Sequence, residues 1–304
     1  MVDFPKLSQE KLLQRLNYPQ GKLRMVLDTD TYNEIDDQFA VVYALKSQER
    51  LQIEAFYAAP FFNELSEGPK DGMEKSYLEL QKIAALLPEA QGIPIHRGSE
   101  TYLPDAQTPV ISDAARDLVD RAMDSPDDDP LYVIAIGAIT NVASAILLEP
   151  RIIEKIVVVW LGGHWLQWPD TKEFNLFQDL HASRTILNSG VPLVLIPCMG
   201  VSSHLATTLA EMREFVKDKG PIGEYLYETF ENCSKDHFGY SRVIWDISTI
   251  AYLNNESWLP NALIHSPLVS EDFRWSSDPS RHFIRVVSYI HRDPVFQDLF
   301  RKLE

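Results

Sequence analysis

The sequence predicts an α/β protein built on a mostly parallel sheet with helices on both faces. Strand-like and helix-like segments alternate along most of the chain, and several strands are uninterrupted apolar runs, as at 131–136 and 156–161. Such runs are typical of parallel strands that are buried on both faces. The 304 residues contain no compositional break, linker or repeat, so we expect one domain over 1–304.

The first elements surround an acidic loop. Residues 8–16 begin with Ser and have helical spacing, which predicts a capped amphipathic helix. The apolar run 25–27 predicts the end of a buried strand, and 39–45 predicts a helix that is apolar on most faces and therefore buried. A second strand is expected over 51–59. The polar stretch 64–72 contains Gly and Pro and predicts a mobile loop.

The rest of the chain continues the alternation of strand and helix. The spacing of Tyr77, Leu80 and Ile83 is helical, whereas the residues from Phe283 onward alternate as in a strand. The further helices are predicted at 74–87, 113–123, 180–187, 247–253 and 293–303, with one after a small-residue turn within 137–148 and two more within 206–233. The further strands are predicted at 92–98, 131–136, 156–161 and 191–196, with paired strands between 262 and 285.

Composition restricts the classes of partner. The chain is 45% hydrophobic and 24% charged, with a formal net charge of -16. So negative a protein does not favour nucleic acid or an anionic membrane as a partner. Two cysteines, Cys198 and Cys233, do not make a disulfide framework. The first residues lack the apolar core typical of a signal peptide, and no apolar run approaches membrane-spanning length. We expect a soluble, cytoplasmic protein.

Five acidic residues lie between the first strand and the first buried helix. They are Asp28, Asp30, Glu34, Asp36 and Asp37. Acids at a helix N-terminus are favourable, but that explains one or two of them and not those at the end of an apolar strand. Ligands bind at the carboxyl ends of strands in open α/β sheets, and hard cations take oxygen ligands. The loop therefore predicts a site for Ca²⁺ or Mg²⁺.

This stretch resembles the signature of the nucleoside hydrolase family, which cleaves the N-glycosidic bond of ribonucleosides. That signature is Asp-x-Asp at a strand end, a short Gly-containing turn, Asp-Asp and a buried helix. Asp28-Thr29-Asp30 and Asp36-Asp37 take these places, while 31–35 is longer than the usual turn and lacks its Gly. The resemblance implies a Rossmann-like open sheet, a role in purine salvage and a homo-oligomer, either dimer or tetramer.

Three further segments are similar to the family in the same order. They are Gly137-Ala-Ile-Thr140-Asn141-Val-Ala, Glu173-Phe174-Asn175 with Asp179, and Trp245-Asp246 before an apolar helix. From the residues alone, Thr140 and Asp246 are equally well explained as helix N-caps. The segment around Asn175 is explained as a surface loop.

The resemblance assigns a role to each matched residue. It implies that Asp30 takes the proton from the attacking water. The implied ligands of a Ca²⁺ ion are Asp30, Asp37, Asp246 and the carbonyl oxygen of Thr140. The implied contacts to the nucleoside are Asp36, Asn63, Glu173, Phe174, Asn175 and Trp245. Trp replaces the family's His at position 245, which implies stacking on the base and a preference for purines.

Two other functions are compatible with parts of the sequence. A non-catalytic nucleoside or sugar binder would retain the metal site without a competent acid, and the Trp at 245 and the altered loop allow this. An apolar strand followed by Asp-x-Asp also opens the haloacid-dehalogenase phosphatases. That pattern requires Thr or Val two residues after the second Asp, where this chain has Tyr32.

Overall fold

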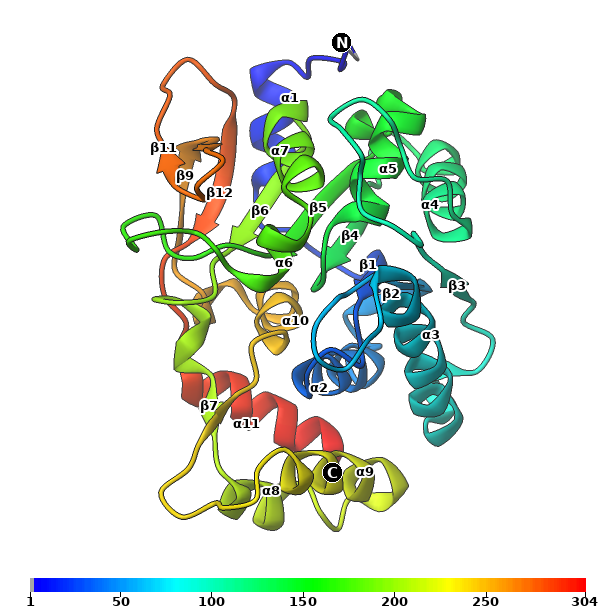
Figure 1. Cartoon of the computed structure of the whole chain (residues 1–304), viewed down its shortest axis with the longest axis vertical. Helices are drawn as coiled ribbons and strands as arrows, with labels where there is room; N and C mark the ends of the chain where they lie inside the picture. The colour runs from blue at the N-terminus through cyan, green and yellow to red at the C-terminus, as the bar shows by residue number, and fades with distance from the viewer. Residues whose placement is uncertain (1–2) are drawn as a thin grey trace.

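An eight-stranded sheet forms the centre of the protein, and the computed structural model describes residues 3–304 (Figure 1). Its strands are β1 (Leu23–Thr29), β2 (Leu51–Ala58), β3 (Ile95–Arg97), β4 (Leu131–Ala135), β5 (Ile156–Leu161), β6 (Leu193–Ile196), β9 (Asn261–His265) and β12 (Phe283–Val287). In space they follow the order β3-β2-β1-β4-β5-β6-β12-β9. All neighbours are parallel except β12 and β9. The predicted fold class is confirmed.

Helices cover both faces of this sheet. They are α1 (Gln9–Leu16), α2 (Asp36–Leu45), α3 (Pro69–Leu86), α4 (Asp113–Asp124), α5 (Thr140–Leu148), α6 (Phe174–Gln178), α7 (Leu180–Ser189), α8 (Leu209–Phe215), α9 (Gly220–Asn232), α10 (Ile247–Asn254) and α11 (Arg292–Leu303). α4, α5 and α7 pack on one face, and α2, α3 and α10 on the other. Successive strand residues enter opposite cores: Met25 and Leu27 join one, Val26 the other. Both faces are therefore apolar.

Two helices that reach the site are enclosed almost completely. All ten residues of α2 are buried, and so are residues 247–253 of α10. The two helices pack against each other on the same face of the sheet. Because protein interiors are close-packed, a helix enclosed in this way has little freedom to shift. The side chains at the N-termini of α2 and α10 are therefore held in fixed positions.

Three segments differ from their predictions. The loop predicted over 64–72 is shorter, because α3 begins at Pro69, and Pro lacks only an amide hydrogen that a first helical turn leaves unused. Within the region predicted as two helices, Ala206–Thr207 forms β7 and pairs with β8 (Arg242–Val243). The paired strands predicted between 262 and 285 are β9 and β12, with a hairpin of β10 (Leu268–Val269) and β11 (Trp275–Ser276) between them.

The remaining regular segments are short. They are the 3₁₀ helices Pro88–Ala90, Pro150–Glu154, Ser202–His204 and Glu256–Trp258. None of the helices between residues 3 and 304 combines the length and the apolarity that crossing a bilayer requires. Cys198 is buried and Cys233 partly buried, and both are free thiols.

The imidazole of His282, next to β12, gives the fold a dependence on acid. Its Nε2 is buried without a hydrogen-bond partner among the described residues, and burial lowers its pKa to about 4. The unfolded chain accepts a proton near pH 6.5. Stability is therefore complete above about pH 6.5 and declines as the pH falls toward 4, with a loss of about 2 kcal/mol at pH 5.

Urea unfolding at pH 7.5 and pH 5 measures this loss. We expect His282→Gln to lose less stability than wild type between the two pH values, by about 2 kcal/mol. His204 is exposed, so His204→Gln is the matched control and should behave as wild type. An equal loss in wild type and His282→Gln would contradict the prediction.

Candidate active site

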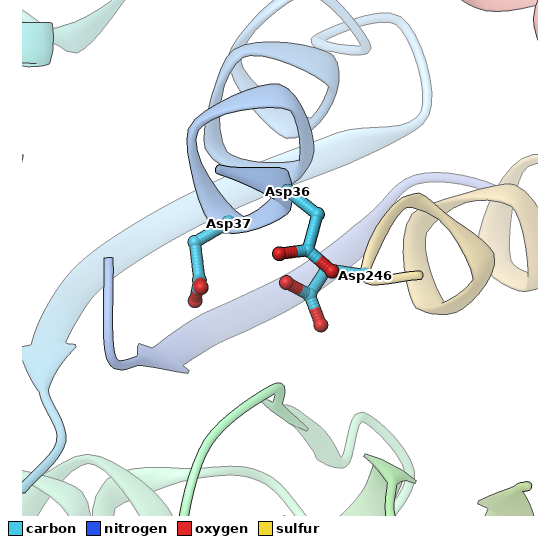
Figure 2. Close-up of side chains that lie close together, drawn as sticks. All are labelled: Asp36, Asp37 and Asp246. Atoms are coloured by element: carbon cyan, nitrogen blue, oxygen red, sulfur yellow. The ribbon is translucent and has the colours of Figure 1, made fainter. Parts of the chain in front are cut away.

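Three buried carboxylates meet where two helices begin. Asp36 and Asp37 occupy the first turn of α2, and Asp246 immediately precedes α10. Figure 2 shows their side chains extending from the two helices into one space. An oxygen from each lies within 4.8 Å of an oxygen from the others. Asp246 occupies the N-cap position of α10, as the alternative interpretation predicted, but its side chain makes no capping hydrogen bond, so capping leaves its carboxylate unexplained.

Asp30 adds a fourth carboxylate beside this triplet. It follows β1, is fully buried, and neither of its side-chain oxygens has a hydrogen-bond partner among the described residues. Burial raises its pKa well above the usual value, and the charges of Asp37 and Asp36 raise it further. Burial likewise raises the pKa of Asp246, with Asp36 the largest charge contribution, and raises that of Asp37 to about 7. The cluster is an electrostatically strained site.

Neighbouring groups orient the carboxylates. The Thr29 hydroxyl donates to Oδ1 of Asp37 at 2.5 Å, and the Trp245 amide donates to Oδ2 of Asp36 at 3.2 Å. Each bond leaves the other oxygen of its carboxylate available. Because Thr29 ends β1 and Trp245 precedes α10, the ends of the sheet and of both helices fix the cluster together.

Asn141 links Asp28, near the end of β1, to Ser99 after β3. Its Nδ2 donates to Oδ1 of Asp28 at 2.7 Å, and its Oδ1 accepts from the backbone amide and the hydroxyl of Ser99 at 2.7 and 2.8 Å. Thr140 beside it is the first residue of α5, and its hydroxyl donates to Asp179 at 2.8 Å. Ile139 holds the N-cap position, so the alternative of Thr140 as the N-cap is wrong.

The donor set fits a hard divalent cation. It consists of carboxylate oxygens only, several without a protein partner, at a separation that one ion can bridge. The predicted ligands Asp37 and Asp246 belong to the triplet. Asp36, which was predicted to contact substrate, completes it, while Asp30 lies beside it. The role of Thr140 as a carbonyl ligand stays a prediction.

A cavity of about 250 Å³ opens at the cluster. Its walls come from segments that follow β1, β4, β5 and β6, which is where open α/β sheets bind ligands. Five of the predicted substrate residues line it, namely Asp36, Glu173, Phe174, Asn175 and Trp245. Asn63 does not line the cavity. Its Nδ2 instead donates at 2.7 Å to Oδ1 of Asn33, which does line it.

Glu173 and Asn175 hold the cavity wall together. Glu173 is the N-cap of α6 and accepts the backbone amides of Asn175 and Gly163 at 2.9 and 2.8 Å. The side-chain Nδ2 of Asn175 donates to the backbone carbonyls of Ile136 and Leu161 at 3.2 and 3.1 Å. The segment predicted alternatively as a surface loop is therefore a short, partly buried helix, and its Asn175 side chain joins the ends of β4 and β5.

The long loop 31–35 is fastened to the opposite side of the site. Glu34 and Arg242 form an ion pair at 2.5 Å, which links this loop to β8, just before Trp245. Glu34 lines the cavity. No local pattern places Glu34 in the cavity wall, because its partner lies 208 positions away in the chain.

Several cavity residues were missed from the sequence. They are Asn33, Ile136, Leu161, His164, Lys172, Cys198 and Met199. All but Asn33 and Lys172 lie within a few residues of the end of β4, β5 or β6. That position is the signal that could have found them, since these strand ends converge on one edge of the sheet.

A sequence model of the family described as inosine-uridine preferring nucleoside hydrolase matches residues 64–287. The chain belongs to this family. The match begins after the acidic loop at 28–37, so it is independent of the resemblance seen in that loop. Family membership leaves no support for the haloacid-dehalogenase alternative.

Named relatives in the family align with about half of the chain. The pyrimidine-specific ribonucleoside hydrolase RihB of Shigella flexneri is 28% identical over 149 residues, which cover 47% of this chain and 47% of the relative. The protein of that name from Escherichia coli O9:H4 (strain HS) is also 28% identical over 149 residues. The aligned region spans about half the length of these relatives.

Solved structures of nucleoside hydrolases share the fold along nearly the whole chain. The plant nucleoside hydrolase PpNRh1 superposes with a TM-score of 0.75 at 18% identity, covering 94% of this chain and 99% of that one. The purine-preferring ribonucleoside hydrolase from Gardnerella vaginalis gives a TM-score of 0.72 at 17% identity, covering 92% and 98%. At such identities the likeness establishes the fold alone.

Proposed function

We propose that this protein hydrolyses the N-glycosidic bond of ribonucleosides, releasing ribose and the free base, with Ca²⁺ as its cation and a preference for purines. The observation that carries the proposal is the buried carboxylate cluster at the floor of a cavity, in a chain of the nucleoside hydrolase family. A nucleoside has no phosphate, so the net charge of -16 does not repel it.

Each carboxylate has a task in this reaction. Asp30 would accept the proton of the attacking water, since its two oxygens lack protein partners among the described residues and burial raises its pKa, which makes it a stronger base than an exposed carboxylate. Asp36, whose Oδ2 the Trp245 amide holds, would orient a ribose hydroxyl. A cation held by Asp37, Asp246 and their neighbours supplies, when bound, orientation of the hydroxyls and a water of lowered pKa.

The wall of the cavity would position the ribose and its base. Glu173 and Asn175 would fix the remaining hydroxyls, although their present hydrogen bonds leave only part of each side chain free. Trp245 is half-buried beside Asp246 and offers an aromatic face for stacking. That face supports a purine preference, whereas the names of the relatives include both pyrimidine-specific and purine-preferring enzymes.

Ribose release from inosine, adenosine, guanosine, uridine and cytidine tests the proposal. We expect release that a chelator abolishes and Ca²⁺ restores, with purine nucleosides turned over faster. Thermal unfolding gives a second readout: because the cation binds only the native state, Ca²⁺ added to chelated protein should raise the Tm. Adding Mg²⁺ in place of Ca²⁺ tests which ion the site prefers.

The two readouts separate the possible outcomes. A Tm that rises with Ca²⁺ without ribose release from any of the five nucleosides would contradict the proposed hydrolysis and favour the non-catalytic binder. Full activity in the chelator would contradict the role of the cation. Faster turnover of uridine and cytidine would contradict the purine preference alone.

A further inference from the structure

One histidine in the cavity has no part in the chemistry described so far. His164 follows β5 and lines the cavity together with Trp245 and the carboxylates. Its ring is half-buried, and Trp168 packs edge-on against it at 6.2 Å between centroids. None of the roles assigned so far assists departure of the base, and the geometry of His164 suits that task.

The backbone on both sides of His164 is fixed. Its amide donates to the Thr171 hydroxyl at 3.0 Å, and its carbonyl accepts from the Trp275 indole at 3.0 Å. Gly163 before it has a φ of +70°, and a Cβ there would lie 2.6 Å from the Thr171 hydroxyl oxygen. The turn that aims the imidazole thus depends on contacts that do not involve the imidazole itself.

The ring has a defined tautomer. Its Nδ1 accepts the backbone amide of Met199 at 3.4 Å, so the proton of the neutral ring lies on Nε2. Nε2 has no hydrogen-bond partner among residues 3–304, and it does not belong to the buried atoms that lack one, so it remains accessible. Burial lowers the pKa of His164, which keeps the ring neutral near pH 7. A neutral N–H donor without a protein partner therefore remains for a ligand.

We infer that His164 is the hydrogen-bond donor to the departing base. This rests on the proposed function. As the C1′–N bond breaks, its electron pair goes to the base nitrogen, and the oxygen of water forms the new bond to C1′. The proton lost by the water goes to Asp30, which returns it to solvent, and the base takes up a proton from solvent. His164 exchanges no proton; its Nε2–H stabilises the negative charge that develops on the base.

Substrates that differ in leaving group test this role. A nucleoside base is a poor leaving group and needs the hydrogen bond, whereas the nitrophenolate of p-nitrophenyl riboside leaves without assistance. We expect His164→Ala to lower kcat for inosine about 100-fold and kcat for the aryl riboside by less than about threefold. The backbone hydrogen bonds of His164 to Thr171 and Trp275 remain in the variant. It loses only the long Nδ1 contact to the Met199 amide and the edge-on packing of Trp168, so it should keep the fold.

Two amide variants form a matched pair. The amide nitrogen of Gln reaches about as far as Nε2 of His, whereas that of Asn reaches only as far as Nδ1. His164→Gln should therefore recover inosine hydrolysis to within about tenfold of wild type, and His164→Asn should behave as His164→Ala. Lys172 is the rival donor in the cavity, but it is exposed and its Nζ lies 5.4 Å from the ring of Phe177.

The outcomes are distinct. Equal losses on inosine and the aryl riboside, no loss on either, or a leaving-group effect in Lys172→Met instead would each overturn the role of His164 while leaving the hydrolase function intact. Wild type that hydrolyses neither substrate would overturn the proposed function and this inference with it.

Discussion

Asp30→Asn is expected to lower kcat for nucleoside hydrolysis by about 1000-fold, within the range for loss of a general base. The amide has nearly the shape of the carboxylate but cannot accept the proton from water. Asp30 is fully buried and both of its oxygens lack partners among the described residues, so no neighbouring protein group depends on its charge. Steady-state kinetics with saturating Ca²⁺ measures the effect.

Stability distinguishes lost chemistry from a damaged fold. Asp30 repels Asp37 and Asp36, so removing its charge should leave the Tm of the chelated protein unchanged or raise it. Asp128→Asn, in the exposed turn before β4, is the control and should match wild type in both respects. Activity of Asp30→Asn near that of wild type would contradict the assignment of Asp30 as the general base.

Gly98→Ala is expected to destabilise the protein by about 3 kcal/mol and to reduce its activity. A Cβ at Gly98 would lie 1.9 Å from the carbonyl oxygen of Ala58 and 2.5 Å from Nδ2 of Asn141. The first contact is with backbone of β2, which cannot turn away. The second would displace the amide that holds Asp28 and Ser99. The substitution therefore strains the sheet and also loosens the hydrogen bonds that hold Asp28, two residues before Asp30.

Urea denaturation and ribose release measure the two effects. Gly68→Ala is the matched control, because Gly68 has extended backbone with φ of 161° and a Cβ there would meet nothing within 4 Å. It should change the free energy of unfolding by less than about 0.5 kcal/mol. Wild-type stability in Gly98→Ala would show that β2 and β3 can separate without cost, against the packing observed.

The local sequence was sufficient for most of the elements. The uninterrupted apolar runs at 131–136 and 156–161 are β4 and β5, since strands buried on both faces have no polar side. The apolar segment 39–45 belongs to the enclosed helix α2. The prediction was less accurate where boundaries depend on distant partners. β7 is only two residues long and forms by pairing with β8, more than thirty positions later.

The site was predictable as a set of segments but not as a geometry. The sequence was enough to locate each segment of the site, because each lies near the end of a strand or the start of a helix. These segments are the acidic loop, Thr140 with Asn141, the segment around Glu173, and Asp246. The contacts that these segments make with one another could not be predicted from the sequence. Asn63 was placed against substrate, but in the structure it holds Asn33, and Asn141 acquires its partners from two other strand ends.

The sequence by itself determined the α/β class, the order of nearly all the elements, and a concentration of acids that only a cation or shared protons can relieve. These follow from local periodicity and from the cost of burying like charges. Only the tertiary structure decided which carboxylates meet and which cavity residues face them. Asp36, Asp37 and Asp246 converge because α2 and α10 pack side by side, although about two hundred residues separate them in the chain. The same folding brings His164 into the cavity with its Nε2 free, and no local pattern carries that information.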